Sequence, residues 1–148
     1  MIYSYFNANF FFGIELARSS HDIFLFQRKY ALELIQEIGL TAAKPVSCPL
    51  DSAVKLHKQG SDLFHDPTTY RRLIGHLVYL TTTRPIISFS VGLLSQFLDK
   101  PMIEHHQTAL RVLKYVKLSS TLGLFFPNRQ ICQIISNSCL VFSSYFRS

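Results

Sequence analysis

Several residue types that mark particular protein classes are scarce or missing in this chain of 148 residues. It has no tryptophan and two methionines, and its three cysteines (Cys48, Cys132 and Cys139) are too few and too scattered for a disulfide framework. We therefore expect reduced thiols and an intracellular protein. Only 16% of the residues are charged while 48% are hydrophobic, so the chain can build a core and extensive disorder is not expected.

Long hydrophobic segments and a signal sequence are also missing. The uncharged runs 85–98 and 130–146 are each shorter than the ~20 apolar residues of a membrane span, and Ser and Gln interrupt them. The aromatic N-terminus has no basic segment and no small-residue cleavage site. We expect no signal peptide, no transmembrane segment and no membrane partner.

The motifs of common active sites are absent as well. There is no Gly-rich phosphate loop, no nucleophile elbow, no Cys/His metal spacing and no helical pair of carboxylates. Asp51, Asp62 and Asp66 lie far apart in predicted loops, which favours turn and capping roles. The adjacent His105 and His106 point about 100° apart on a helix, which favours structural or surface roles over metal binding. We predict no catalytic residue and no metal site.

A basic charge is present, and it is unevenly distributed. The net charge is +6, and the half from Arg71 onward holds nine Lys/Arg residues against only Asp99 and Glu104. A basic half suits a polyanion such as nucleic acid. The alternative is a solvated basic surface that has no partner.

Three apolar segments between residues 70 and 117 predict three helices, separated by Arg84-Pro85 and Lys100-Pro101, because proline interrupts helices. Asp66 is the expected N-cap of the first helix, with Pro67 at its first position. An apolar face at helical spacing comprises Tyr70, Leu73, Ile74, Leu77 and Thr81 in the first segment. The corresponding face of the third segment comprises Ile103, His106, Leu110, Leu113 and Lys117, backed by Ala109 and Val116.

A further helix and two hairpins complete the predicted fold. Residues 27–38 form a helix with Ala31, Leu34, Ile35 and Ile38 on one face and Gly39 as its stop. The β-favouring runs Phe10–Ala17 and Ile23–Phe26 predict one hairpin, and Leu122–Phe126 with Ile131–Ser136 predict another. The fold class is therefore α+β, mainly α-helical with about four helices and a short β-hairpin near each end.

A family resemblance is carried by YRRLIG at 70–75, LVYLT at 77–81, TRP at 83–85, ISF at 87–89, LSQF at 94–97 and ALRVLKY at 109–115. In order and spacing these segments resemble the Pol polyprotein of copia-type retrotransposons, in the reverse transcriptase part that follows the polymerase palm. The resemblance implies four parts: a primer-grip-like hairpin and helix at 1–40, an extended linker at 41–65, a thumb-like three-helix unit at 66–118 and a degenerate start of ribonuclease H at 119–148.

The resemblance also implies residues that contact nucleic acid, with an RNA–DNA hybrid or another nucleic acid as the partner. Around the primer-grip-like hairpin these are Phe12, Gly13, Ile14, Gln27 and Lys29. Phosphate contacts, which position a duplex without reading its sequence, are implied for Arg71, Arg72, Arg111, Lys114 and Lys117. An ordinary bulge glycine in a hairpin at Gly13 and a solvated basic face on the last helix are the structural alternatives.

The sequence departs from the family pattern at several positions. Asn137 and Cys139 stand where the family has the acidic metal ligands of ribonuclease H, Ile86 replaces an Asp and Leu118 replaces a helix-ending Gly. The Tyr-x-Asp-Asp signature of reverse transcriptases is absent. The parent enzyme would need Mg²⁺, but we expect no cofactor and no autonomous enzyme activity here, since the rest of the parent polyprotein is missing from this chain.

Three functional interpretations remain open. The first is a truncated reverse transcriptase fragment that at most binds template–primer. The second is a non-catalytic helical module that contacts another protein through exposed aromatic side chains. The third is a vestigial open reading frame without function.

Overall fold

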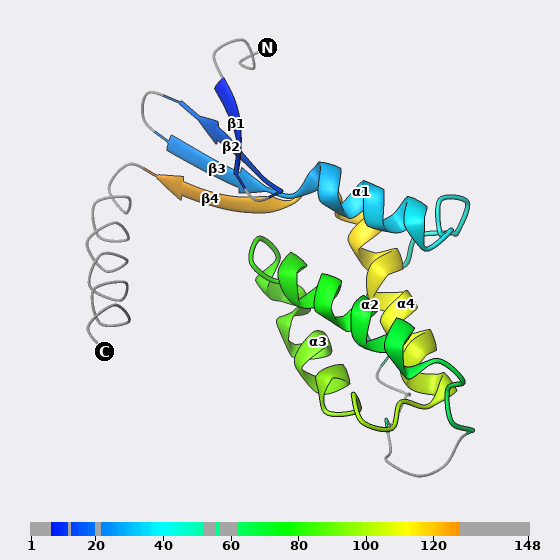
Figure 1. Cartoon of the computed structure of the whole chain (residues 1–148). Helices are drawn as coiled ribbons and strands as arrows, with labels where there is room; N and C mark the ends of the chain where they lie inside the picture. Colours follow the sequence, from blue (N-terminus) through cyan, green and yellow to red (C-terminus); the bar gives the residue numbers. More distant parts are fainter. Residues whose placement is uncertain (1–6, 12, 20–21, 52–55, 57–61, 128–148) are drawn as a thin grey trace, which may run out of the picture. The chain divides into compact units, whose positions relative to one another are not determined.

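The computed structural model describes residues 7–11, 13–19, 22–51, 56 and 62–127. Within these residues the fold is α+β and mainly α-helical, with four α-helices, as predicted. The chain divides into two compact units. One is a helical unit, Gln27–Leu122, and the other is a sheet unit formed by Met1–Phe26 together with Gly123–Ser148. Figure 1 shows the elements of each unit. The four-part functional division at 40, 65 and 118 stays a prediction.

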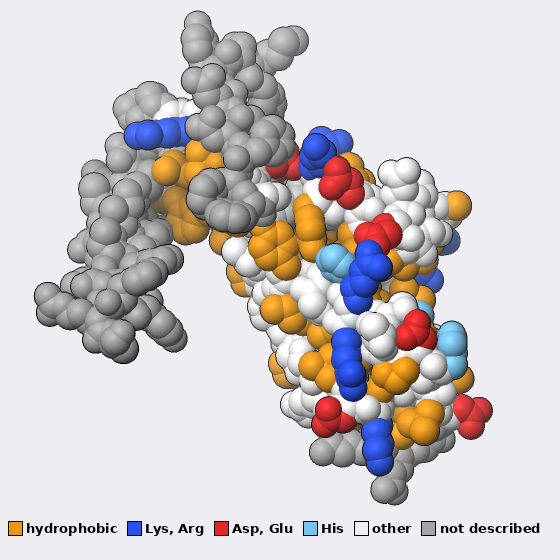
Figure 2. All heavy atoms as spheres, in the orientation of Figure 1, with side chains coloured by type: hydrophobic (Ala, Val, Ile, Leu, Met, Phe, Trp, Pro, Cys, Tyr) orange, Lys and Arg blue, Asp and Glu red, His pale blue; other side chains and the backbone are white. Residues whose placement is uncertain are grey.

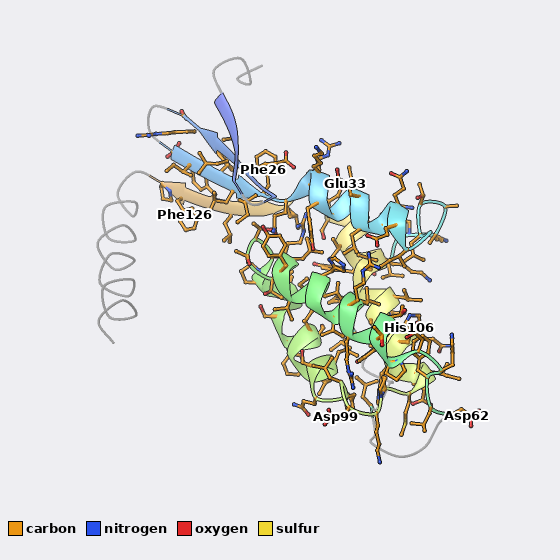
Figure 3. All side chains as sticks on the ribbon, viewed as in Figure 1. Phe26, Glu33, Asp62, Asp99, His106 and Phe126 are labelled. Carbon is orange, nitrogen blue, oxygen red and sulfur yellow. The ribbon has the colours of Figure 1, made fainter. Side chains whose placement is uncertain are left out.

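Four antiparallel strands in the order β1-β2-β3-β4 make up the described part of the sheet unit. They are β1 (Asn7–Phe11), β2 (Ile14–Arg18), β3 (Asp22–Phe26) and β4 (Gly123–Pro127). Strand β4 pairs with β3, with Phe26 opposite Gly123 and Asp22 opposite Pro127; the labelled Phe26 and Phe126 lie on these neighbouring strands (Figure 3). The predicted strand at 122–126 is thus confirmed, and its expected partner, 131–136, lies outside the described residues.

The prediction of one continuous β-run from Phe10 to Ala17 is wrong. The chain reverses at Gly13, which has a φ of 77°, so the run contributes to two strands, β1 and β2, that pair with each other. Glycine reaches this left-handed conformation without the steric cost of a Cβ. Strand β1 begins at Asn7, and its two asparagines, which are poor strand formers, concealed it in the sequence.

Pairing of β4 with β3 requires a glycine at the start of β4. A Cβ added at Gly123 would lie 2.2 Å from the backbone oxygen of Leu25 and 2.9 Å from the Cβ of Phe26. Such distances are far inside van der Waals contact, so only a residue without a side chain lets the two backbones approach this closely. Phe24 and Phe125 then lie opposite each other, with ring centroids 4.6 Å apart.

Helix α1 (Arg28–Glu37) matches the predicted helix at 27–38. Ala31, Leu34 and Ile35 are buried, and Gly39 follows the helix with a φ of 78°, so the predicted stop is confirmed. A left-handed glycine just after the last turn allows the chain to leave the helix without strain.

Helix α2 (Pro67–Leu80) begins as predicted. The Asp66 carboxylate accepts hydrogen bonds from the backbone N–H groups of Thr68 and Thr69, both at 3.1 Å. These bonds satisfy donors that a helix start leaves free. Hydrogen bonds also lower the pKa of the Asp66 carboxylate. The bond from the Thr69 hydroxyl is the largest cause, and the bonds from the backbone N–H groups add to it. The face predicted from Tyr70, Leu73, Ile74 and Leu77 is buried.

The segment after α2 forms a short 3₁₀ helix, η1 (Pro85–Ile87), followed by α3 (Ser88–Ser95). The Tyr70 hydroxyl, on α2, donates to the Leu94 carbonyl of α3 at 2.9 Å. Burial of Tyr70 raises its pKa, so this hydroxyl stays protonated and can act as a donor.

Helix α4 (Ile103–Leu118) is the longest of the described elements. Its predicted apolar face is wrong in part: Ile103 is 40% exposed and His106 and Leu110 are only half-buried. The buried face is rotated and comprises His105, Thr108, Ala109, Val112, Leu113, Tyr115 and Val116. The cause is that α4 packs against α1, α2 and α3, and that a buried histidine and threonine interrupt the apolar signal.

The core of the helical unit draws on all four helices (Figure 1). Its buried residues run from Ala31, Leu34 and Ile35 of α1 to Val112, Leu113 and Val116 of α4, with the faces of α2 and α3 between them. Helix α1 therefore shares one core with α2, α3 and α4.

Candidate nucleic-acid interface

The basic side chains predicted for the last helix have different surroundings in the structure. Arg111 and Lys114 are three residues apart on α4, which separates them by about 4.5 Å along the axis and places them on the same side. Both are half-buried. Among the described residues neither has an ion-pair partner, and the Nε of Arg111 has no hydrogen-bond partner. The Arg111 Nε is itself buried, so an external anion can meet only the solvent-exposed part of these two side chains.

Lys117, the third member of the predicted basic stripe, is engaged within the protein. Its Nζ donates to the backbone carbonyls of Leu40, Thr41 and Ala43, at 3.3 Å for Leu40 and 2.8 Å for Ala43. These bonds tie the last turn of α4 to the loop after α1. Residues three apart on a helix are rotated by about 60° relative to one another. The line from Arg111 through Lys114 to Lys117 therefore turns around α4 and meets this loop at Lys117. These bonds favour a structural role for Lys117 over the nucleic-acid contact that the resemblance implies, and no observation tests that contact.

Two other predicted phosphate contacts also have partners within the helical unit. Arg72 of α2 is exposed and forms an ion pair with Glu37 of α1. The Nε of Arg71 donates to the Leu98 carbonyl at 2.9 Å. Among the described residues Arg71 has no carboxylate partner, whereas Arg72 is paired with one.

The residues predicted around the hairpin are divided between the two units. Gly13 lies in the exposed turn between β1 and β2, and Ile14 is the first residue of β2, while Phe12 lies outside the described residues. Lys29 is exposed in the first turn of α1, with its Nζ 3.8 Å from Glu33. Gln27 is fully buried, so in this structure its side chain does not reach the surface.

Gln27 belongs to a buried polar group that sequence reasoning missed. The Thr83 hydroxyl donates to the Gln27 Oε1 at 2.8 Å, and the Nη1 of Arg84 lies 3.4 Å from the Thr83 Oγ1. The Nη2 of Arg84 donates to the Ser120 carbonyl at 2.9 Å. Arginine is rarely buried, so the residue type did not predict the burial of Arg84. The available sequence signal was its position immediately before a proline between two helices.

The histidines of α4 have structural roles, as predicted. His105 is buried and stacks on Phe97 with ring centroids 3.9 Å apart, and its Nδ1 accepts from the N–H of Met102 at the helix start. His106 stacks on Phe64 at 4.2 Å. Burial and the nearby His65 lower the pKa of His106.

The helical unit also has a groove of about 350 Å³ among α1, α2 and α4. Leu34, Ile38, Leu73 and Leu110 line it together with polar side chains, among them His76. The His76 Nδ1 lies 2.6 Å from the hydroxyl of Tyr30. Burial raises the pKa of Tyr30, so its hydroxyl stays protonated. The other ring nitrogen of His76, Nε2, is buried without a hydrogen-bond partner among the described residues.

Basic and acidic side chains are interspersed with apolar ones on the face of the helical unit that Figure 2 shows. The described part of this face therefore carries no broad basic patch. The described ranges contain no group of three or more His, Cys, Asp or Glu that could hold a metal ion. Asn137 and Cys139 lie outside them. No helix in the described part of the chain is long and apolar enough to cross a membrane.

Known proteins similar to this chain identify its origin. The Pol polyprotein from transposon RE1 of Arabidopsis thaliana, named retrovirus-related, is 39% identical over 117 residues, which are 79% of this chain and 8% of that protein. The corresponding polyprotein from transposon RE2 of the same plant is 37% identical over 117 residues, again 79% of this chain and 8% of that protein. This chain belongs to the retrovirus-related Pol polyproteins of copia-type transposons.

Shorter relatives of this Pol family match the same share of the chain. A putative transposon Ty5-1 protein of Saccharomyces cerevisiae is 33% identical over 116 residues, covering 77% of this chain and 38% of that protein. The Pol-related chain thus spans less than half of each of these relatives. No protein-family model and no solved structure matches it.

Proposed function

We propose that this Pol chain is the post-palm part of a reverse transcriptase, and that α4 contacts the backbone of an RNA–DNA hybrid through Arg111 and Lys114. One observation carries the proposal. These two cations share one side of α4 and have no acidic partner among the described residues, whereas Arg72 is paired with Glu37. The relatives' names, which describe retrovirus-related Pol polyproteins, support the assignment to this kind of machinery.

The physical basis is the attraction between fixed cations and phosphates. Flexible Arg and Lys side chains on one side of a helix can reach neighbouring phosphates of one strand without reading its sequence. Each phosphate neutralised releases counterions, so binding weakens as salt is added. The chain's net charge of +6 adds a general attraction for polyanions.

The proposal assigns no catalytic step to this chain. Polymerisation and ribonuclease H cleavage both use divalent metals held by carboxylates. The sequence has no Tyr-x-Asp-Asp signature, and it has Asn137 and Cys139 at the positions that resemble acidic metal ligands. We infer that its contribution is to bind nucleic acid and that chemistry is supplied by other parts of a Pol polyprotein.

The test is fluorescence anisotropy of a labelled RNA–DNA hybrid titrated with the chain at low salt. The Arg111→Glu, Lys114→Glu double variant is expected to bind at least about tenfold more weakly, because two contacts become repulsions. The matched control is Arg18→Glu, Lys100→Glu, which makes the same change in net charge at two exposed positions that are not part of α4. It should lose only the smaller, general electrostatic attraction.

Equal loss of affinity in both double variants would mean that binding depends on net charge alone and that α4 has no specific role. Absence of binding by a chain that is folded, as judged by circular dichroism, would refute the proposed function itself.

A second candidate function rests on a separate observation. On η1 and α3, Ile86 is 62% exposed and Phe89 is 76% exposed, and they lie three residues apart in a run without any charge. Exposed apolar side chains grouped in this way are typical of contacts with other proteins. Self-association that persists at high salt and disappears in Phe89→Asp, in a chain that does not bind nucleic acid, would favour this candidate.

A further inference from the structure

The buried polar group around Thr83 and Arg84 links three segments that are far apart in the sequence. We name Thr83 and Arg84 the 83–84 junction; they lie between α2 and η1. Through its side chains the junction contacts Gln27 at 2.8 Å and the carbonyl of Ser120 at 2.9 Å. Only 1% of Thr83 and 2% of Arg84 is exposed, so solvent does not compete for these bonds.

The backbone of the junction is also held in place. The N–H of Arg84 donates to the Leu80 carbonyl at 3.1 Å, and the Arg84 carbonyl accepts from the N–H of Ile87 at 3.2 Å. Pro85 keeps Arg84 out of the helical conformation, at φ −131° and ψ 74°. A guanidinium attached to a backbone fixed at both ends reaches Ser120 with little further loss of conformational freedom.

Burying the Arg84 guanidinium has a cost in free energy, which its bond to Ser120 has to offset. The Nε of Arg84 and the Nε2 of Gln27 are buried without a hydrogen-bond partner among the described residues. Burial also lowers the pKa of Arg84. An aliphatic side chain would fill the same space without these penalties, but it could not donate to Ser120. The arginine therefore stabilises a particular connection rather than the core in general.

The two segments held by the junction are the chain connections between the units. Gln27 is the first residue after β3, and Ser120 lies just before β4. Strands β3 and β4 are joined only through the whole of residues 27–122, and their ladder ends at the pair Phe26 and Gly123. Closing so long a loop has an entropic cost. That cost falls when the two ends of the loop are already fixed.

We infer that the 83–84 junction holds the two connections between the helical and sheet units, and that it thereby decides whether β4 stays paired with β3. Gln27 is fixed by Thr83 where the chain leaves β3, and Ser120 is fixed by Arg84 where the chain approaches β4. Loss of either contact releases one end of the loop and lets β4 detach before the helical core unfolds.

Native-state hydrogen exchange of the full chain, followed by NMR, tests this inference. Arg84→Met removes the donor to Ser120 with little change in length, and Thr83→Val removes the donor to Gln27 with almost no change in shape. In both variants the β4 amides should exchange at least about tenfold faster, while the buried amides of α2 change far less. The control is Ile35→Val, which trims the buried face of α1 and should leave the relative protection of β4 unchanged.

Unchanged β4 protection in Thr83→Val and Arg84→Met would overturn the inference. So would equal acceleration of β4 and α2, because that pattern reports global destabilisation and not local release of a strand. If Arg84→Met does not fold, Thr83→Val decides alone. The test does not involve nucleic acid, so its outcome is independent of the proposed function.

Discussion

At Lys117 a structural role of a basic residue can be tested separately from a role in binding nucleic acid. Its ammonium donates to three backbone carbonyls in the loop after α1. We predict that Lys117→Met, which keeps the length of the stem, destabilises the chain and leaves hybrid binding by the folded protein nearly unchanged. The carbonyls of Leu40, Thr41 and Ala43 would lose a donor that the folded chain supplies.

The size of the effect follows from the contacts. A hydrogen bond to a charged group contributes about 1.5–3 kcal/mol when buried, and a cation in the last turn of a helix adds about 0.3–1 kcal/mol. Lys117 is half-buried, so screening reduces the total, and we expect a loss of about 2 kcal/mol. With a slope of about 2 kcal/mol per molar urea, the midpoint of unfolding falls by about 1 M.

The assay is urea unfolding followed by far-UV circular dichroism, with Lys114→Met as the matched control one turn earlier on α4. Lys114 has no partner among the described residues, so its variant should stay within about 0.5 kcal/mol of the unsubstituted chain. Hybrid binding should show the opposite order, with Lys114→Met the weaker binder. Equal stability of the two variants would refute the structural role assigned to Lys117.

Other predictions follow from single contacts. Gly123→Ala should abolish the protection of the β4 amides in hydrogen exchange, because its Cβ would meet a backbone oxygen of β3. Gly92→Ala, whose Cβ would lie in open space on α3, should raise the free energy of unfolding in urea by about 0.5–1 kcal/mol. Ile86→Asp should raise the melting temperature, since a carboxylate at the start of η1 gains about 0.3–1 kcal/mol from the helix dipole; a lower melting temperature would contradict this. Because the pKa of His106 is lowered on folding, by burial and by His65, the unfolded chain binds more protons, so stability should fall as the pH drops below about 6.5. A His106→Gln variant should show a flatter profile.

Local signals in the sequence were sufficient for the helices. Asp66 with Pro67 marked the start of α2, and Gly39 marked the end of α1, because capping and left-handed turns are set by the residues themselves. The buried face of α2 followed from its apolar spacing, since that helix buries only aliphatic and aromatic side chains on that face.

Long-range contacts were beyond the reach of those signals. The pairing of β4 with β3 depends on where the chain returns after the whole helical unit, and no local pattern encodes that distance. The buried Arg84 has the same origin, because its polar partners are supplied by segments near residues 27 and 120. On α4, contact with three other helices buries His105 and Thr108, so an apolar pattern placed the buried face incorrectly.

The measurement that tests the central claim most directly is the salt dependence of hybrid binding. Affinity falls as salt is added, and each phosphate contact contributes about 0.7–0.9 to the steepness of log affinity against log salt. The slope of the Arg111→Glu, Lys114→Glu variant should therefore be shallower by about 1.4–1.8 than that of the unsubstituted chain. The Arg18→Glu, Lys100→Glu control should keep most of the original slope. Identical slopes for the α4 variant and the unsubstituted chain, with both folded, would contradict a nucleic-acid interface on α4.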